Sequence, residues 1–228
     1  MITLITLALD IFVFISNSET EAFFYKINIH KGIPTHDTIA RFTNYNYNYT
    51  TIKGLSEILS LAKADGSSLS LIIGCHGDAW IPATDIKRSF GGAKIESRID
   101  ISTLRQALQQ SNIIAEYILF DDCYMSSIEV AYELRHACKH LIASPAEIMA
   151  IGMPYSDIAK DLINSPNYEA ICSKFYNYYA NNPSIPYGAI AVTKCSELDS
   201  LARIAKRITP SPISYDIQFY DSYKPHIF

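Results

Sequence analysis

Residues 69–77 read LSLIIGCHG, and residues 117–123 read YILFDDC. Each stretch is a short apolar run, rich in residues that favour strands, and it leads directly into residues capable of chemistry. In an open α/β sheet, ligands and catalytic groups collect at the carboxyl ends of the strands. We therefore predict two buried strands whose ends carry His76 and Cys123 to one site.

The rest of the sequence alternates similar runs with helical patterns, which is typical of an α/β fold with a mostly parallel sheet wrapped by helices. Ser126 and Glu129 have the spacing of a capping box at the start of one helix, and residues 78–98 are expected to form a polar loop. Strands are predicted over residues 11–15, 22–29, 68–74, 117–120, 141–144 and 187–193. Helices are predicted over residues 50–64, 101–109, 126–138, 157–163, 167–181 and 196–208.

The composition limits the class of protein. The chain has 228 residues, of which 49% are hydrophobic and 18% charged, so disordered, collagen-like and coiled-coil proteins are excluded. Without a visible linker, residues 1–228 are predicted to form a single domain with an irregular tail over 210–228. The formal net charge of -4, without a basic stripe, argues against a nucleic-acid partner.

The amino-terminal residues do not indicate a membrane protein. The first sixteen residues are apolar, but they contain no Lys or Arg and are interrupted by Asp10. Neither a cleavable signal peptide nor a membrane span is predicted from them, because a span needs about 18 apolar residues in a row.

The five cysteines form an odd number and include no C-x-x-C pair. This pattern disfavours a disulfide framework and a thiolate zinc site, and it predicts at least one free thiol. His136 and His140 have the i, i+4 spacing of two ligands on one helix face, but the Glu of an H-E-x-x-H motif is missing. We therefore predict no metal site there.

His76 and Cys123 carry the chemistry that the sequence offers. A histidine about 50 residues before a nucleophilic cysteine is the spacing found in caspases, although both residues are also common as structural residues in a core. Gly77 leaves room for a substrate carbonyl, and its N–H can stabilise an oxyanion. A helix after Cys123 favours its thiolate, whereas Asp121 and Asp122 oppose it. One of these carboxylates is suited to a basic substrate side chain; the other interpretation is that both cap the turn into the helix.

The two stretches also resemble a known family. LSLIIGCHG, followed over residues 117–158 by YILFDDCYMSSIEVAYELRHACKHLIASPAEIMAIGMPYSDI, is similar to the clostripain-related cysteine peptidases, relatives of caspases, gingipains and legumains. The resemblance is strong over residues 69–161 and fainter over 11–29 and 188–208. It implies a caspase-like three-layer sandwich around a six-stranded, mainly parallel sheet with helices on both faces.

The resemblance implies a role for each matching residue. Cys123 is the nucleophile that forms an acyl-enzyme, and His76 gives a proton to the leaving amine. The N–H groups of Gly77 and Cys123 form the oxyanion hole, and Asp121 belongs to the pocket that selects Arg or Lys. Lys87 and Arg88 are candidates for the bond that is cut during self-activation.

The sequence departs from the family at three places. Asp122 replaces a small residue, and Ile151 stands where relatives carry an acid. The family's first strand is expected to be missing, since residues 10–16 match its second strand. Three explanations stay open: the chain is a fragment, residues 1–9 substitute for the strand, or this member is degenerate. The alternative function is a peptidase-like fold that binds peptides or proteins without cleaving them.

The remaining expectations follow from the resemblance. Peptide or protein substrates with a basic residue are the expected partners, and a monomer is expected. The resemblance implies export to the periplasm or the surface of a bacterium. It also suggests calcium as a cofactor. A thiol redox protein is disfavoured because no second cysteine stands beside Cys123, although Cys75 could approach it from a neighbouring strand. Cys138, Cys172 and Cys195 are expected to be inert packing residues.

Overall fold

The computed structural model describes residues 2–7, 10–16, 18, 20–43, 48–62, 69–81, 89–163 and 165–208. The predicted tail over 210–228 lies outside the described residues. By its internal contacts the chain divides into two units, Met1–Ser196 and Glu197–Phe228. The architecture below is that of the first unit, and helix α6 (Leu198–Ile208) belongs to the second. The single domain stays a prediction.

In the described part of the first unit there are eleven strands, five α-helices and three short 3-10 helices, of which the last extends into the second unit. The strands are β1 (Ile2–Leu7), β2 (Asp10–Ser16), β3 (Glu21–His30), β4 (Ile33–Thr43), β5 (Leu69–Gly74), β6 (His76–Gly77), β7 (Phe90–Gly91), β8 (Arg98–Ile99), β9 (Ala115–Asp121), β10 (Cys138–Ala143) and β11 (Ala191–Lys194). The helices are α1 (Ile52–Ala62), α2 (Ile101–Gln110), α3 (Ile128–Leu134), α4 (Tyr155–Leu162) and α5 (Tyr168–Ala180), with 3-10 turns η1 (Asn48–Thr50), η2 (Ile95–Ser97) and η3 (Cys195–Glu197).

The main sheet is wider and more mixed than predicted. Its order is β11-β10-β9-β5-β1-β2-β3-β4, so it has eight strands where six were expected. Only the central pairs β5–β9 and β9–β10 are parallel, and the five other pairs are antiparallel. At most four residues separate successive strands from β1 to β4. Such connections are too short for the crossover that a parallel pair needs, so these strands form hairpins.

The residues before β2 form a strand that was not predicted. Strand β1 lies between β2 and β5 and pairs antiparallel with both along its whole length, from Ile2↔Gly74 to Leu7↔Leu69 on the β5 side. The three explanations given for the family's first strand stay predictions.

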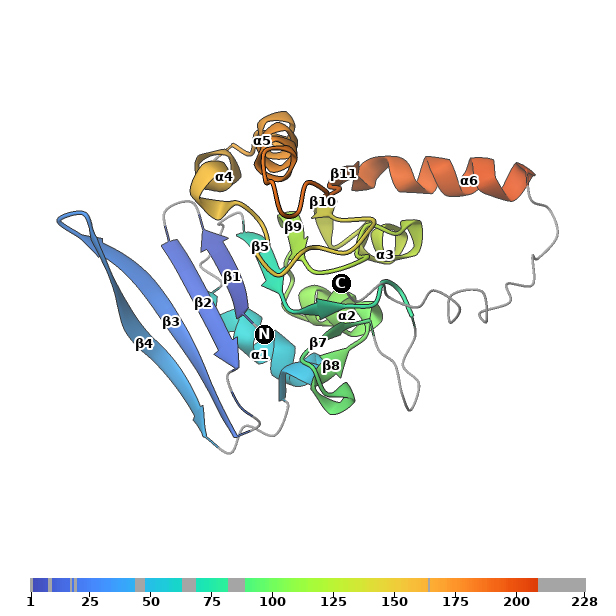
Figure 1. The fold of residues 1–228 in the computed structure, drawn as a ribbon. Coiled ribbons are helices and arrows are strands. Elements are labelled where there is room, and N and C mark those ends of the chain that lie inside the picture. Colours follow the sequence, from blue (N-terminus) through green and yellow to red (C-terminus); the bar gives the residue numbers. More distant parts are fainter. Residues whose placement is uncertain are drawn as a thin grey trace. The chain divides into compact units, whose positions relative to one another are not determined.

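The hairpin of β3 and β4 ends the sheet, and β4 was not predicted (Figure 1). Its residues are nearly all exposed, so the chain lacks the alternation of apolar and polar residues that marks a half-buried strand. The turn uses Lys31 and Gly32, whose φ angles are +51° and +80°, as a tight hairpin turn requires.

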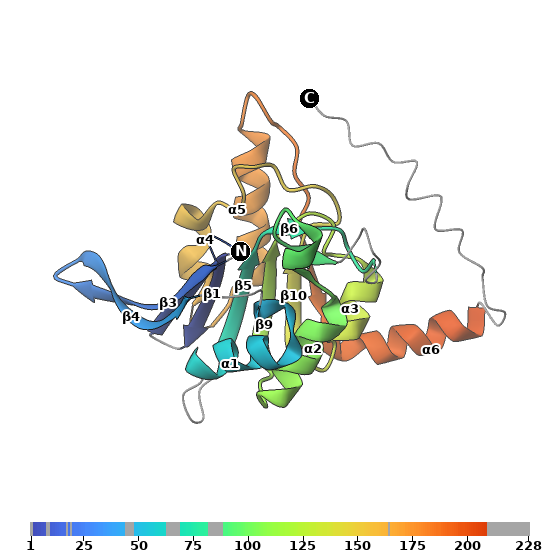
Figure 2. The same ribbon diagram turned by 90° about the horizontal axis from the view of Figure 1, so that it is seen from below.

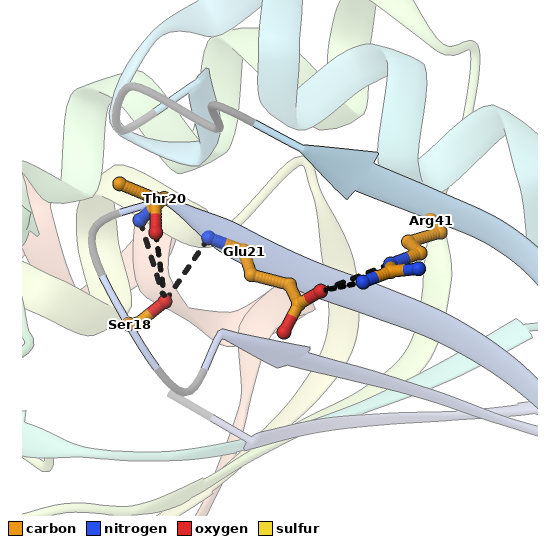
Figure 3. Close-up of polar contacts among 4 residues, drawn as sticks. All are labelled: Ser18, Thr20, Glu21 and Arg41. Atoms are coloured by element: carbon orange, nitrogen blue, oxygen red, sulfur yellow. Dashed lines mark hydrogen bonds and ion pairs between the residues drawn. The ribbon is translucent and has the colours of Figure 1, made fainter.

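Polar contacts hold the other end of this hairpin (Figure 3). The Arg41 Nε donates to Glu21 Oε1 at 2.9 Å, which ties β4 to the first residue of β3. The Ser18 Oγ accepts from the backbone N–H groups of Thr20 and Glu21 at 3.3 and 3.1 Å. The chain therefore enters β3 through a turn that a serine hydroxyl closes.

Helices cover both faces of the sheet, as predicted. Helices α1, α2 and α3 lie on one face, and α4 and α5 lie on the other (Figures 1 and 2). The central strands β5, β9 and β10 are consequently buried almost throughout. On the α4 and α5 side, Leu119 and Ile142 from the sheet pack with Ile158 and Phe175 from the helices. Each such side chain contributes about 1.5–3 kcal/mol by leaving water.

Helix α3 is shorter than the predicted helix over 126–138. Its N-cap is Ser127, whose Oγ accepts from the Val130 N–H at 3.3 Å, so the capping box assigned to Ser126 and Glu129 is wrong by one residue. The helix ends early because the carbonyl of Ala137 accepts from the Ala115 N–H at 2.9 Å, which draws the chain into β10 at Cys138. Among the described residues, no helix is long and apolar enough to cross a membrane.

The burial of β9 predicts which substitutions unfold this protein. Leu119→Ala removes a fully buried side chain from the central strand and is expected to lower the free energy of unfolding by about 2–5 kcal/mol. The matched control is Ile39→Ala on the exposed strand β4, with an expected loss below about 1 kcal/mol. Urea unfolding measures both, and equal losses would contradict the position of the core.

Candidate active site

The site lies where two parallel strands end side by side. The last paired residues of β5 and β9 are Gly74 and Asp121. The chain continues from β5 into Cys75, His76 and Gly77, and from β9 into Asp122 and Cys123. The structure thus brings together the two segments that carry the predicted histidine and cysteine, at the sheet edge where they were expected.

Gly77 packs directly on the backbone of the cysteine segment. A Cβ atom on Gly77 would lie 2.9 Å from the Asp122 Cβ, 3.1 Å from the Cys123 N and closer still to the Cys123 carbonyl oxygen. No side chain fits there. We predicted that glycine gives room to a substrate carbonyl; in this structure it gives room to the backbone of Cys123. The exposed His76 is the residue before Gly77, and both lie in β6, which pairs with β7.

The chain turns sharply after Cys123. Tyr124 has a φ of +63°, which side-chain-bearing residues rarely adopt. Two contacts hold it: its N–H donates to the Ala146 carbonyl at 3.0 Å, and its hydroxyl donates to Glu147 Oε1 at 2.8 Å. The Cys123 Sγ accepts from the Ile148 N–H at 3.4 Å. The loop that follows β10 therefore packs over the half-buried thiol.

Of the two opposing effects expected at Cys123, the helix field that favours a thiolate is not the stronger. Burial raises the pKa of the Cys123 thiol; the Ile148 N–H opposes that effect, and the carboxylates of Glu147, Asp122 and Asp78 add to it. Helix α3 begins only at Ile128 and has seven residues. Its N-terminus therefore lies too far along the chain from Cys123 to offset the rise in the pKa of this thiol. A base must therefore remove the proton if this thiol is to attack.

Asp121 binds the same loop as Cys123. Its carboxylate accepts from the Met153 N–H at 3.1 Å and from the Tyr155 hydroxyl at 3.0 Å. Gly152 has a φ of +66°, and a Cβ there would lie 3.0 Å from Asp121 Oδ2. Burial raises the pKa of Asp121, although both hydrogen bonds lower it. The residue holds the turn into α4, and its assignment to a substrate pocket stays a prediction.

Asp122 points to the opposite neighbour. Its side chain is 1% exposed and accepts from Cys75, from the N–H at 2.5 Å and from the thiol at 3.3 Å. Burial raises the pKa of Asp122 to about 7, despite the two hydrogen bonds from Cys75 that lower it. The interpretation in which Asp121 and Asp122 cap the turn into the helix is wrong, because Ser127 caps α3.

A second, three-stranded sheet supports the histidine segment. Its order is β6-β7-β8, so part of the predicted polar loop over 78–98 is ordered structure. Phe90 in β7 is buried against Phe120 of β9, with ring centroids 5.4 Å apart. An ion pair between Asp78 and Arg98 ties the residue after β6 to β8. The predicted cleavage residues Lys87 and Arg88 lie outside the described residues.

The other cysteines lie away from this reaction geometry. Cys138 and Cys195 are buried with their Sγ atoms 3.6 Å apart, Cys172 is half-buried, and no disulfide is formed. Cys75 contacts Asp122 rather than Cys123. Within the described residues, no group of three or more His, Cys, Asp or Glu side chains could hold a metal ion. His140 Nδ1 instead lies 2.9 Å from the Tyr168 hydroxyl.

Sequence reasoning missed the loop that covers the site. Four residues of this loop contact the run from Asp121 to Tyr124 at the end of β9, and none of the four was assigned a role. They are Glu147, Ile148, Met153 and Tyr155. The sequence offered one signal, the spacing of Pro145, Gly152 and Pro154 after the predicted strand. This spacing predicts a turn, but it does not show which residues the turn contacts.

Comparison with known proteins gives a family and several similar structures. A model of the clostripain family matches residues 5–215. A secreted C11 cysteine protease from Bacteroides thetaiotaomicron, named iotapain, is 40% identical with a TM-score of 0.80, over 86% of this chain and 59% of that chain. This chain therefore spans about three fifths of the length of that relative. A search of curated proteins found no match.

Two further structures are similar. A clostripain from B. thetaiotaomicron in complex with the peptide inhibitor BTN-VLTK-AOMK is 47% identical with a TM-score of 0.53, over 58% of this chain and 59% of that chain. An inactive zymogen of a C11 protease from Parabacteroides distasonis is 27% identical with a TM-score of 0.68, over 85% of this chain and 54% of that chain.

The raised pKa of Asp122 predicts a pH-dependent stability. The unfolded carboxyl titrates near its ordinary value of 3.8, whereas the folded one titrates at about 7. The folded state therefore binds the proton more tightly, and folding loses stability as the pH rises through this interval, with no further loss above it. Asp122→Asn removes the titrating group. Its free energy of unfolding relative to the wild type is expected to rise by about 2–3 kcal/mol between pH 5 and pH 8.

Urea unfolding of both proteins at the two pH values measures this difference, and the titrating groups whose pKa does not depend on Asp122 cancel in it. A difference that does not change with pH would show that Asp122 titrates at its ordinary pKa in the folded protein.

Proposed function

The chain belongs to the clostripain family, and from this premise we propose that it is a cysteine endopeptidase that hydrolyses peptide bonds after Arg or Lys. Cys123 is the nucleophile and His76 the general base and acid. The observation that carries the proposal is the close packing of Gly77 on the backbone of Cys123, because it puts the histidine segment beside the nucleophile at the ends of two parallel strands.

The raised pKa of Cys123 assigns the first proton transfer. Because burial and three acidic groups favour the thiol, His76 takes its proton as Sγ attacks the scissile carbonyl. A bond forms between Sγ and the carbonyl carbon, and the carbon–nitrogen bond breaks as His76 returns the proton to the leaving amine. Water then attacks the thioester with His76 as base, which releases the acid and restores the thiol.

The oxyanion that forms during attack needs N–H donors on both segments. We assign this role to the backbone N–H groups of Gly77 and Cys123, which belong to the two segments in contact. Donors fixed in a folded backbone need no reorganisation when the charge develops, and each contributes about 2.7–4 kcal/mol in such sites.

Asp121 is the residue that we assign to the basic substrate side chain. Asp121 is the last residue of β9, two residues before the nucleophile, and its carboxylate is half-buried, so a guanidinium or ammonium group beside it is attracted through little water. The Met153 and Tyr155 bonds leave a lone pair on Oδ1, which accepts only from the Met153 N–H among these donors. The name of the inhibitor bound to the similar clostripain contains VLTK, which ends in a lysine.

Three parts of the proposal rest on the relatives. Export from the cell is inferred from the secreted relative, and self-cleavage at Lys87 or Arg88 from the zymogen. Calcium stays an inference from family resemblance, since the described residues show no cluster of ligands that would hold it. The competing function, binding without cleavage, is favoured by one observation, the raised pKa of Cys123.

An active-site label tests the proposal. An acyloxymethyl ketone with a terminal Arg is expected to modify the wild-type protein at Cys123, as located by peptide mass spectrometry. Cys123→Ala and His76→Ala are expected to lower the hydrolysis of Arg and Lys peptides by at least about 10³-fold. The matched control is Cys172→Ser, which removes a half-buried thiol from α5 and keeps full activity. A folded wild type that binds Arg peptides without turnover would establish the competing function.

Selectivity tests Asp121 separately. Asp121→Asn keeps the shape and the acceptor for Met153 but removes the charge, so kcat/KM for Arg and Lys substrates is expected to fall about 10- to 100-fold. A substrate with Gln in place of Arg serves as the uncharged control and should change little. Equal losses on both substrates would assign Asp121 to the turn into α4 and not to the substrate.

A further inference from the structure

We propose that Asp122 is a positioning residue, whose buried carboxylate ties the segment that carries His76 to the segment that carries Cys123 and so sets the spacing of the two groups. The inference rests on the proposed function, in which these two residues react together. It concerns a residue that neither attacks nor transfers a proton but lies between the two that do.

The contacts of Asp122 are placed to do this. The carboxylate accepts from the N–H of Cys75 through Oδ1 at 2.5 Å and from its thiol through Oδ2 at 3.3 Å. Cys75 is the residue before His76, and Asp122 is the residue before Cys123. Each end of the link is thus one residue from a reacting group.

The link begins where the regular sheet ends. The parallel ladder between β5 and β9 stops at Gly74 and Asp121. Beyond it, His76 and Gly77 pair with β7 in the small sheet, and the chain turns at Tyr124 with a φ of +63°. No ladder bond between β5 and β9 holds the two segments at this level. The carboxylate of Asp122 joins them instead. It accepts a hydrogen bond from the N–H of Cys75, the first residue beyond the last ladder pair.

The close packing of Gly77 depends on that spacing. A Cβ on Gly77 would lie 3.1 Å from the Cys123 N, so the two segments are in backbone contact two residues past Cys75 and one residue past Asp122. A loss of the link lets the histidine segment separate from Cys123 without breaking the sheet. Misplacement of a reacting group by about 1 Å costs up to about 100-fold in rate.

Burial of this carboxylate has a cost that its hydrogen bonds offset only in part. The side chain is 1% exposed, and its pKa is raised to about 7 although two donors face it. An uncharged small side chain would avoid this desolvation. The carboxyl therefore costs stability at a position where its oxygen atoms join the two segments, which is the pattern expected of a positioning group.

Three variants separate positioning from general damage. Asp122→Ala removes the link, and Asp122→Asn keeps an oxygen that can accept the Cys75 N–H. Ser56→Ala is the matched control: it removes a buried hydroxyl that donates to the carbonyls of Ile52 and Ala107, between α1 and α2. For each protein, kcat and KM are measured on one Arg peptide, and thermal unfolding is recorded in the same buffer.

Asp122→Ala is expected to lower kcat about 10- to 100-fold with KM within about threefold of the wild type, and Asp122→Asn to restore kcat to within about threefold. Ser56→Ala should keep the wild-type kcat even where its melting temperature falls as far. A wild-type kcat in Asp122→Ala overturns the proposal, as does an equal loss of kcat in both Asp122 variants or in Ser56→Ala.

Amide hydrogen exchange of a peptide that spans residues 74–77 tests the link without activity. Exchange is expected to be faster in Asp122→Ala than in the wild type and unchanged in Asp122→Asn, because the Cys75 N–H loses its acceptor only in the first. If the wild type fails to cleave, the proposed function fails, and the exchange still decides whether Asp122 holds this segment. Unchanged exchange in Asp122→Ala overturns the link.

Discussion

The structure depends on how one run of four residues divides its contacts at the end of β9. Asp121, Cys123 and Tyr124 bind the loop that follows β10, whereas Asp122 binds Cys75 at the end of β5. An extended chain sends successive side chains to opposite sides, so Asp121 and Cys123 can hold one neighbour and Asp122 another, whereas Tyr124 reaches the loop through a left-handed turn with a φ of +63°. The nucleophile segment is therefore fixed between two other segments. One carries the histidine, and the other is the loop after β10 that contacts Asp121.

The electrostatics of this arrangement determine how the cysteine reacts. Burial and three nearby carboxylates keep the Cys123 thiol protonated, with the Ile148 N–H as an opposing contact. A cysteine that stayed a thiolate would react with any electrophile, whereas a thiol beside a histidine is activated when a substrate is in place. The two Asp residues have different surroundings. Asp122 is buried and accepts a hydrogen bond from Cys75, whereas Asp121 is partly exposed to solvent. The second is the one available to a cationic substrate.

Local pattern was a good guide where a segment is buried by its own periodicity. The runs that became β5 and β9, and the helices α1, α2 and α5, were predicted to within a few residues, because apolar spacing reflects the face that each one buries. The exposed β4 and the pairing of β1 were missed, since an edge strand has no buried face and a hairpin partner is chosen by the whole sheet. Helix α3 was overextended because the pull of β10 on Ala137 is a tertiary contact.

The sequence by itself determined the class of fold, the clostripain resemblance and the ends of two strands at which His76 and Cys123 stand. The fold class and the strand ends follow from apolar periodicity and residue type, whereas the resemblance follows from the motifs quoted above; all of these can be read from the chain alone. Only the tertiary structure decided that Gly77 makes room for the backbone of Cys123, that Asp122 faces Cys75 while Asp121 faces Met153, and that burial raises the pKa of the Cys123 thiol. Such outcomes depend on burial and on hydrogen-bond partners brought from distant segments, and the order of residues along the chain does not contain them.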